Sequence, residues 1–595
     1  MFGCFGRRHG RVSWKGGMVM NLHVSDRNGR KYLVIQKSFR GPDGKPSKKN
    51  IKTIGYADLY TDQYEDPIAH FREVARQMTA EEKEKRQMLF SVSMDENLQL
   101  GSTGTKNLGY AIPLKIFYRL GLDKFLNGKA QSEGFEYNTV SIMVLLVMAR
   151  ILMPGSKKSA YENRGKFFER FDFTLDDVYR SLGHFDAISG EMQRYMYESV
   201  RAVYGSDTSI VYYDVSNYYF EIKKEDDFRK YGVSKEKRKR PIVQKGLAMD
   251  RSGVPLRYEL FRGNMTDKET FRKVIGDVRR DYGTGRIVVV ADMGVITGDN
   301  INYLVGPNPD RPKNGYVFSF SVAGGSDLFK KYVLDEKGYV CMDGKPLKPD
   351  ADFKIKWRVT PREIWVTMKD GKKRQRTVHE KQVVFWSKKY ADKARAERGA
   401  IIEKAKALIA DPQKYTRATS YGAAAYVGNI DYDKETGEVI CKHLYLDEQK
   451  IEEQEKLDGY YAMVTSEMNM PMSDIVDVYR GMWEIEETFK LTKSDLEARP
   501  VYVRSKEQIN AHFLTCFIAL TILRIMQKQT DRKFSSSKII DCLSSIVCLH
   551  EFENVFLFGY RSTISDKLCD AFDVDLSKKR LSLASIKNIL AMAKS

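Results

Sequence analysis

The stretch 479–493 holds the side chains best suited to chemistry on a phosphodiester. On a helix of 3.6 residues per turn, Tyr479, Met482, Glu486, Lys490 and Lys493 lie within about 80° of one another. One helical face would then present a carboxylate beside a phenol hydroxyl and two amines. The same pattern fits an ordinary amphipathic helix with a solvated acid–base face, so this helix alone does not decide between the two interpretations.

Two aspartates far upstream favour the catalytic interpretation. Asp214 lies within the apolar run Val211-Tyr-Tyr-Asp-Val-Ser, and Asp292 ends the run Val288-Val-Val-Ala-Asp. A carboxylate in an apolar strand costs free energy unless something pairs with it, although a single Asp at a strand end is usually a turn residue. Together with Glu486, the two aspartates could share two divalent ions, which lie about 3.5–4 Å apart in phosphoryl-transfer sites. We therefore expect Asp214, Asp292 and Glu486 to converge on two Mg²⁺ ions, with Mn²⁺ as a substitute.

The composition favours a nucleic-acid partner. The 595 residues, 42% hydrophobic and 30% charged, predict a soluble globular protein of several units. An excess of 99 Lys and Arg over 79 Asp and Glu gives a net charge of +20, which favours a polyanion, although a merely basic soluble protein fits the charge as well. The seven cysteines are scattered without a CxxC motif, which fits a reducing cytoplasm better than a zinc ribbon or a disulfide framework.

No membrane association is expected. The longest apolar run, residues 140–153, is too short to span a bilayer and predicts a buried helix. The first 17 residues lack the apolar segment of a signal peptide, and Met18 or Met20 are plausible alternative starts.

The elements that must position the candidate site follow from the apolar periodicity. Residues 22–56 predict a β-meander followed by a helix, and residues 113–203 predict helices, with a helix–turn–helix possible at Gly183. A mixed α/β sheet is predicted from strands at 209–215, 242–250, 256–262, 286–292, 315–322 and 460–465 with two intervening helices. After residue 501 the pattern is helical to the end.

These motifs resemble those of DDE transposases of bacterial insertion sequences, in the branch of the IS-four group whose β-rich insertion precedes the catalytic glutamate. The resemblance covers roughly residues 110–530 and is carried by residues 212–221, 263–267, 290–294, 458–465, 479–493 and 496–502. It implies an α/β fold: an RNase H-like mixed sheet core interrupted by a β-rich insertion domain, with helical N- and C-terminal flanks. The expected divisions are a β-meander with a helix (1–100), a helical DNA-end-binding region (101–205), the first core part (206–325), the insertion (326–455), the second core part with the catalytic Glu (456–530) and a C-terminal helical region (531–595).

The resemblance also implies roles for individual residues. Asp214, Asp292 and Glu486 would be the metal-binding triad, and Tyr479 and Lys493 would match the tyrosine and lysine of the family's Tyr–Arg–Glu–Lys signature. The arginine position holds Met482, and Arg480 points about 80–100° away from the shared face. Contact with DNA phosphate is therefore expected to depend more on Lys490 or Arg499.

Relatives with such an insertion can stack one of its aromatic side chains on a base flipped out of the DNA. Trp357, Trp365 and Trp386 are the candidates here, and Trp386 is slightly preferred because it follows a basic stretch. Each could instead be a core residue of the insertion. The basic run 235–240 has the same two interpretations, a phosphate contact or a solvated loop.

The sequence thus predicts an enzyme that binds double-stranded DNA at the ends of its own insertion sequence, cleaves it, and joins the 3′-hydroxyls to target DNA. It would act as a homodimer in the bacterial cytoplasm, associated with the nucleoid. The alternatives are another RNase H-like nuclease, such as a resolvase, and a non-catalytic DNA-binding derivative.

Overall fold

The computed structural model describes residues 19–40, 46–84, 104–135, 137–232, 240–308, 313–416, 419–432, 438–439 and 443–595. Met18 and most of the basic run 235–240 lie outside these ranges. The chain divides into two compact units, residues 1–102 and 103–595, which are described separately.

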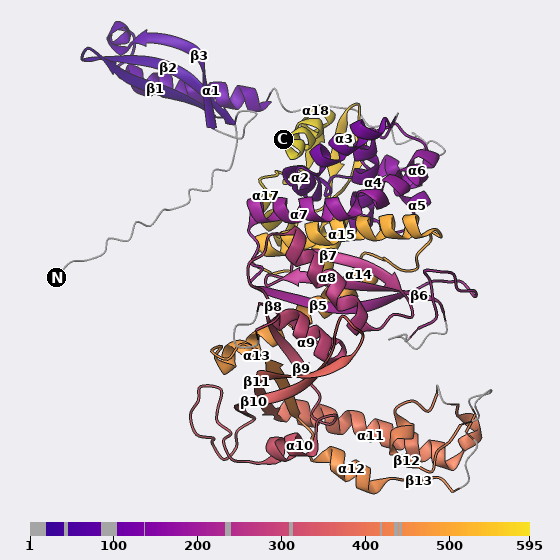
Figure 1. Ribbon diagram of the computed structural model, residues 1–595. Coiled ribbons are helices and arrows are strands. Elements are labelled where there is room, and N and C mark those ends of the chain that lie inside the picture. Colours follow the sequence, from indigo (N-terminus) through magenta and orange to yellow (C-terminus); the bar gives the residue numbers. More distant parts are fainter. Residues whose placement is uncertain are drawn as a thin grey trace, which may run out of the picture. The chain divides into compact units, whose positions relative to one another are not determined.

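The N-terminal unit is the predicted β-meander with its helix (Figure 1). Strands β1 (Val19–Arg27), β2 (Arg30–Arg40) and β3 (Pro46–Tyr56) form an antiparallel sheet. A 3₁₀ turn, η1 (Ala57–Tyr60), leads to α1 (Pro67–Glu84), which packs beside β1. The β1–β2 turn needs left-handed backbone at Asn28 and Gly29, and the Asp26 carboxylate accepts a 2.9 Å bond from the Gly29 N–H.

An eight-stranded mixed sheet forms the centre of the second unit and confirms the predicted mixed α/β fold (Figure 1). Its spatial order is β10-β11-β14-β9-β8-β5-β6-β7. The strands predicted from the sequence are β5 (Ile210–Tyr219), β6 (Ile242–Asp250), β7 (Pro255–Arg262), β8 (Val288–Ala291), β9 (Gly315–Phe320) and β14 (Tyr460–Thr465). Among these, β5, β8 and β9 are parallel, and the remaining pairs are antiparallel.

Helices cover both faces of this sheet. One face packs against α8 (Asp267–Asp281) and α9 (Gly298–Val305), which flank the turn η3 (Met293–Val295). The other packs against α13 (Met472–Arg480), α14 (Met482–Lys493) and α15 (Lys506–Gln529). In length and composition α15 could cross a membrane, but 94% of that stretch is buried inside the protein, as expected of a core helix.

The helical region before β5 and the C-terminal region form one body. It contains α2 (Ala111–Arg119), α3 (Leu122–Glu133), the predicted buried helix α4 (Thr139–Leu152), α5 (Lys157–Glu162), η2 (Asn163–Lys166), α6 (Leu175–Ala187) and α7 (Ser189–Tyr204). The C-terminal region adds α16 (Ser536–Ser545), α17 (Thr563–Phe572) and α18 (Leu583–Lys594).

Two predictions for these regions are wrong. Gly183 lies inside α6, so the chain does not turn there, and α6 ends only at Ala187. The C-terminal region is not wholly helical either, because β15 (Val547–Phe552), β16 (Val555–Phe558) and β17 (Arg580–Ser582) form a sheet with β4 (Thr105–Asn107). This sheet joins segments more than 400 positions apart.

The strands of the predicted insertion extend the core sheet. β10 (Phe353–Thr367) and β11 (Lys373–Ser387) pair along their whole length, and β11 pairs with β14. The rest is mostly helical: α10 (Asp327–Leu334), α11 (Lys388–Ala410), η4 (Pro412–Lys414), η5 (Ala423–Tyr426) and α12 (Glu448–Glu455), with the short pair β12 (Val427–Gly428) and β13 (Tyr445–Leu446). The β structure of this segment therefore lies mainly at the edge of the core sheet.

Candidate active site

Asp214 and Asp292 lie side by side at the centre of the large sheet. β5 and β8 are parallel neighbours, and their last matched positions are Tyr213 and Ala291. Asp214 and Asp292 each come one residue later, on strands about 4.8 Å apart. Both aspartates are half-buried.

Both side chains belong to the sheet face that α13 and α14 cover. Residues two positions apart on a strand share a face. Tyr212 and Val290, two positions before the aspartates, pack in the same hydrophobic core as Met482 and Ile485 of α14. This arrangement follows from the sequence, because the apolar residues of each strand alternate between two separate cores.

The Tyr479 hydroxyl connects α13 to the sheet carboxylates. It donates a 2.8 Å hydrogen bond to Asp292 Oδ1, and the Ser319 hydroxyl lies 3.4 Å from the same oxygen. Burial, and then the charge of Asp292, raise the pKa of the Tyr479 hydroxyl, and Glu486 contributes in the same direction. The hydroxyl therefore stays protonated, and Glu486 lies within electrostatic range of it.

Ser319 is a site residue that the sequence did not single out. It lies on β9, next to β8, and its hydroxyl also accepts a 2.9 Å bond from the Met293 N–H. Ser319 thus ties the backbone after β8 to the Asp292 carboxylate. The only sequence signal for it is its alternate position in a predicted strand.

The single helix predicted over 479–493 is wrong, because the chain breaks at Gly481. Tyr479 belongs to α13 and Glu486 to α14. A Cβ at Gly481 would collide with the Tyr212 hydroxyl of β5. At the junction between the helices the backbone therefore lies so close to β5 that only glycine fits.

The carboxylates do not form a closed metal site. Within the described ranges, no three Asp, Glu, His or Cys side chains gather closely enough to hold one ion. The donor types nevertheless suit a hard divalent cation, because two aspartate carboxylates occupy adjacent strands and Glu486 is exposed on the helix that packs over β5.

The predicted phosphate contacts lie along α14 and beyond it. Lys490 is exposed, the Lys493 amine lies 5.4 Å from the ring centre of Tyr218, and the Arg499 guanidinium lies 5.5 Å from that of Tyr219. Both tyrosines belong to the half of β5 that follows Asp214. Lys493 and Arg499 therefore lie beside the strand that carries Asp214.

Neither Met482, at the arginine position of the family signature, nor the nearby Arg480 offers an unpaired charge in the structure, and Arg240 is paired as well. Met482 is buried and offers no charge to a phosphate. Arg480 forms a 3.3 Å ion pair with Asp477 on α13. Arg240, the described end of the basic run 235–240, lies 3.5 Å from Glu221.

The three tryptophans occupy different environments. Cross-strand pairs link Trp357 to Val383, Val383 to Met463 and Met463 to Ser319, which lies beside Asp292. Directly paired residues share a face of the sheet, so Trp357 shares the face of the aspartates. Four strand spacings separate Trp357 from Asp292, a distance of about 19 Å. Its side chain is 48% exposed.

Trp386 is three positions after Val383 on β11, so its side chain lies on the opposite face of this hairpin. Its Nε1 donates a 3.0 Å bond to the Asp458 carbonyl. Trp365 is 60% exposed but lies eight residues farther along β10, beyond the paired part of β14. The sequence-based preference for Trp386 thus falls on the side chain facing away from the aspartates.

Asp267 is another carboxylate near the end of β8, where Asp292 lies. It begins α8, and its Oδ2 lies 3.4 Å from the position that a Cβ on Gly294 would occupy, just after Asp292. Asp267 ends the motif Gly263-Asn-Met-Thr-Asp, one of the segments that carry the family resemblance. Thr266 of this motif also forms a capping box with Glu269 at the start of α8.

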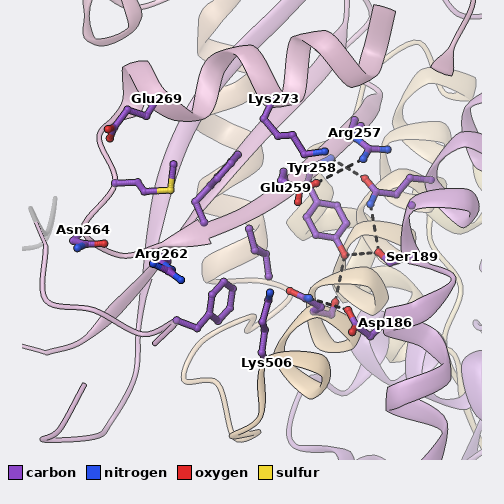
Figure 2. Close-up of a pocket in the computed structure, with 17 residues that line it drawn as sticks. Asp186, Ser189, Arg257, Tyr258, Glu259, Arg262, Asn264, Glu269, Lys273 and Lys506 are labelled. Atoms are coloured by element: carbon purple, nitrogen blue, oxygen red, sulfur yellow. Dashed lines mark hydrogen bonds and ion pairs between the residues drawn. The ribbon is translucent and has the colours of Figure 1, made fainter. Parts of the chain in front are cut away.

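A separate cavity of about 730 Å³ lies beside the edge strand β7 (Figure 2). Arg257, Glu259, Lys273 and Lys506 are among the charged side chains that line it, and Tyr258 is anchored there by a 3.3 Å contact with the Ser189 hydroxyl. None of the three predicted catalytic carboxylates lines this cavity.

Two family models match the chain. Residues 358–522 match the model described as "Transposase DDE domain", and residues 22–88 match "IS1634 family transposase, N-terminal domain". No curated protein matches the chain. The first match contains Tyr479, Glu486 and Lys493, and the second contains the whole N-terminal sheet apart from the start of β1. Two parts of the chain are therefore similar to transposase domains, and together with the mixed sheet these matches support a transposase.

Proposed function

We propose that this protein binds the ends of its insertion sequence, cleaves them, and joins the freed 3′-hydroxyls to target DNA. The observation that carries the proposal is the placement of Asp214 and Asp292 on adjacent parallel strands, beneath the helix that bears Glu486. The transposase matches support this reaction class. The placement within the IS-four group remains a prediction, since the N-terminal match names the IS1634 family.

Asp214, Asp292 and Glu486 would hold two Mg²⁺ ions, for which Mn²⁺ would substitute. When bound, such ions activate the attacking water or 3′-hydroxyl and stabilise the leaving oxygen. Since the Tyr479 and Ser319 contacts both fall on Oδ1 of Asp292, Oδ2 of this carboxylate would be the oxygen that takes part in ligation. Glu486, on a separate helix, would complete the ligand set when DNA is bound.

The cations along α14 would hold the DNA backbone. Lys490, Lys493 and Arg499 follow Glu486 and lie on or beyond the helix that covers β5. Phosphates gripped there would keep the scissile bond beside the carboxylates, because positioning supplies much of the rate in phosphoryl transfer. Cutting two ends together implies a homodimer in the DNA complex, acting in the bacterial cytoplasm at the nucleoid.

The deciding experiment measures cleavage of DNA from the flanks of the coding region with Mg²⁺, Mn²⁺ or excess chelator. Asp214→Asn and Glu486→Gln should each lower cleavage by about a thousandfold or more, since a lost metal ligand removes several kcal/mol of transition-state stabilisation. DNA binding should remain. Asp477→Asn is the matched control, because this aspartate lies on α13 but pairs with Arg480 at the surface.

The same assay separates the alternatives. A transposase yields products joined to a target plasmid, whereas a resolvase cuts branched DNA without joining it. A non-catalytic derivative binds the ends and leaves them intact with either metal. Cleavage that survives excess chelator would refute the proposed active site.

A further inference from the structure

The N-terminal sheet has one covered face and one uncovered face. Leu33 and Ile35 of β2 are fully buried, and their partners on β1 are Val24 and Leu22. This apolar face is the one against which α1 can pack, since α1 lies beside β1 and buries Ala75. The residues that alternate with them form the other face.

That other face is polar, and we call it the polar sheet face. It consists of Asn21, His23, Ser25, Arg27, Arg30, Tyr32, Val34, Gln36, Ser38, Lys48, Asn50, Thr53 and Tyr56. Two contacts confirm that these side chains share one surface: Gln36 Nε2 donates a 3.0 Å bond to Asn50 Oδ1, and the Tyr32 and Tyr56 rings meet edge to face at 5.1 Å.

Charge is distributed unevenly across this unit. The described side chains of the three strands include a single acid, Asp26, against seven cations: Arg27, Arg30, Lys31, Lys37, Lys48, Lys49 and Lys52. The following residues 57–79 reverse the sign, with two arginines against five acids: Asp58, Asp62, Glu65, Asp66 and Glu73. Directly paired residues share a face, so Arg27, Arg30 and Lys48 belong to the polar sheet face, whereas Lys31, Lys37, Lys49 and Lys52 lie on the α1 side. The described residues of the polar sheet face thus include three cations and no acid, which suits a polyanion on that face.

Two arginines lie over tyrosine rings of this face. The Arg27 guanidinium lies 3.9 Å from the ring centre of Tyr32, and that of Arg30 lies 4.2 Å from the ring centre of Tyr56. Arg30 also pairs with Asp58 at 2.6 Å. Such stacked guanidinium groups are ordered before a ligand arrives, so less entropy is lost on binding.

The centre of the face carries hydrogen-bonding groups that suit base edges. The bond between Gln36 and Asn50 uses one donor and one acceptor, which leaves an amide oxygen and an amide NH₂ side by side. In the major groove, adenine presents an acceptor and a donor next to each other, which is the complementary pattern.

The dimensions also agree. Three strands spaced about 4.8 Å apart have a backbone width of roughly 10 Å, and the major groove of B-DNA is about 12 Å wide. We propose that the polar sheet face binds in the major groove of double-stranded DNA, with Gln36 and Asn50 against base edges and Arg27 and Lys48 near the phosphates. The identity of the DNA as the element's end rests on the function proposed above.

The charge part of the proposal is tested in the full-length protein. The probes are a duplex from the DNA flanking the coding sequence and a scrambled duplex of equal length. Arg27→Ala/Lys48→Ala should weaken binding to both and lower the slope of log affinity against log salt by about 2, since each lost phosphate contact contributes roughly 0.9. The matched control is Arg72→Ala/Arg76→Ala, which removes two exposed cations from α1, on the other side of the sheet.

The recognition part uses a neutral change. Gln36→Ala/Asn50→Ala should weaken binding to the flanking duplex by about 5- to 150-fold, the range for loss of a good base contact, and leave binding to the scrambled duplex nearly unchanged. Both residues lie at the surface of the unit, so the melting temperature should match that of the parent protein.

The outcomes are separable from those of the active site. If the Arg27→Ala/Lys48→Ala variant and its α1 control behave alike, or if the amide pair binds both duplexes normally, the polar sheet face is not a DNA-binding surface. Binding of an acidic protein to this face, with DNA binding intact, would lead to the same conclusion. Failure of Asp214→Asn to stop cleavage would refute the catalytic proposal and leave these binding results standing.

Discussion

The hydroxyl of Tyr479 and the carboxylate of Asp292 form a 2.8 Å hydrogen bond that connects residues 187 positions apart in the chain. The bond runs from the end of α13 to the end of β8, across the segment that contributes the β10–β11 hairpin to the sheet. It fixes one carboxylate oxygen of Asp292 before any metal binds. Orientation of this kind is what outer-shell partners of a metal ligand provide.

Tyr479→Phe tests this relationship. Removal of the hydroxyl should raise the Mg²⁺ concentration needed for half-maximal cleavage, or lower the cleavage rate, by about 10- to 100-fold, as for other outer-shell partners. The measurement is a titration of cleavage with Mg²⁺ at saturating DNA. Tyr213→Phe is the control, because its hydroxyl bonds Thr270 at 2.7 Å and its side chain packs in the core on the opposite face of the sheet. Equal metal requirements in both variants would contradict the role of Tyr479.

Gly481→Ala tests the break between α13 and α14. The new methyl group would collide with the buried Tyr212, so we expect a loss of about 1–3 kcal/mol in the free energy of unfolding, together with reduced cleavage. Gly399→Ala on α11 is the matched control, since nothing lies within 4 Å of its added Cβ, and helix propensity should stabilise it by up to about 1 kcal/mol. Urea unfolding measures both, and a neutral Gly481→Ala variant would show that the junction can shift.

The strands that carry Asp214 and Asp292 could be predicted from the sequence because their order depends on local periodicity. β6 and β14 have the predicted bounds, and β5 begins one residue later than expected and continues to Tyr219. These runs are bounded by turn residues, so the information lies within a few positions. The position of Asp214 inside β5 followed directly, whereas β8 is shorter than the predicted strand 286–292 and ends at Ala291, one residue before Asp292.

The errors arise where distant contacts decide the structure. Nothing local in Tyr479-Arg-Gly-Met marks a helix break, because Gly481 is required by Tyr212 of β5, a residue 269 positions earlier. The side chains of β15 and β16 do not alternate cleanly, and β15 depends on β4 at the other end of the chain. Ser319 is important only because β9 pairs with β8, which no single-strand pattern reveals.

Stability should depend on pH through two buried lysines. The amines of Lys157 on α5 and Lys245 on β6 have no hydrogen-bond partner among the described atoms, and burial lowers the pKa of Lys157 to about 7 and that of Lys245 to about 8. In the unfolded chain both return to 10.5. Above the folded pKa and below the unfolded pKa, the unfolded state binds more protons, so the free energy of unfolding should rise with pH, by at most about 1.4 kcal/mol per pH unit for each lysine.

Lys157→Met checks this dependence. Urea unfolding at about pH 7 and about pH 9 should show a smaller rise for the variant than for the parent protein, because one of the two titrations is gone. Lys158→Met is the control. The amine of Lys158, the next residue, is exposed and lies 3.7 Å from Glu162, so its removal should leave the pH dependence unchanged. An unaltered rise in Lys157→Met would show that this amine does not titrate in that range.

The final prediction concerns Trp357, which lies on the face of the aspartates with an exposed ring. Its distance of about 19 Å from Asp292 corresponds to between five and six base steps of 3.4 Å, so DNA held at the carboxylates can reach it. If the ring stacks on an unpaired base, Trp357→Ala should fold normally and bind ends, yet slow second-strand cleavage by about 5- to 150-fold, the equivalent of 1–3 kcal/mol. Trp357→Phe should recover part of that loss, and Val359→Ala, an equally exposed change on the same strand, should cause none.

Trp386→Ala should behave differently, because its indole N–H bonds the Asp458 carbonyl on the other face of the hairpin. We expect that variant to melt early and to lose all activities together, with a cost approaching the roughly 3–5 kcal/mol of a buried tryptophan. Thermal melting beside strand-resolved cleavage separates these outcomes, and normal second-strand cleavage by Trp357→Ala would remove this residue from the DNA contacts.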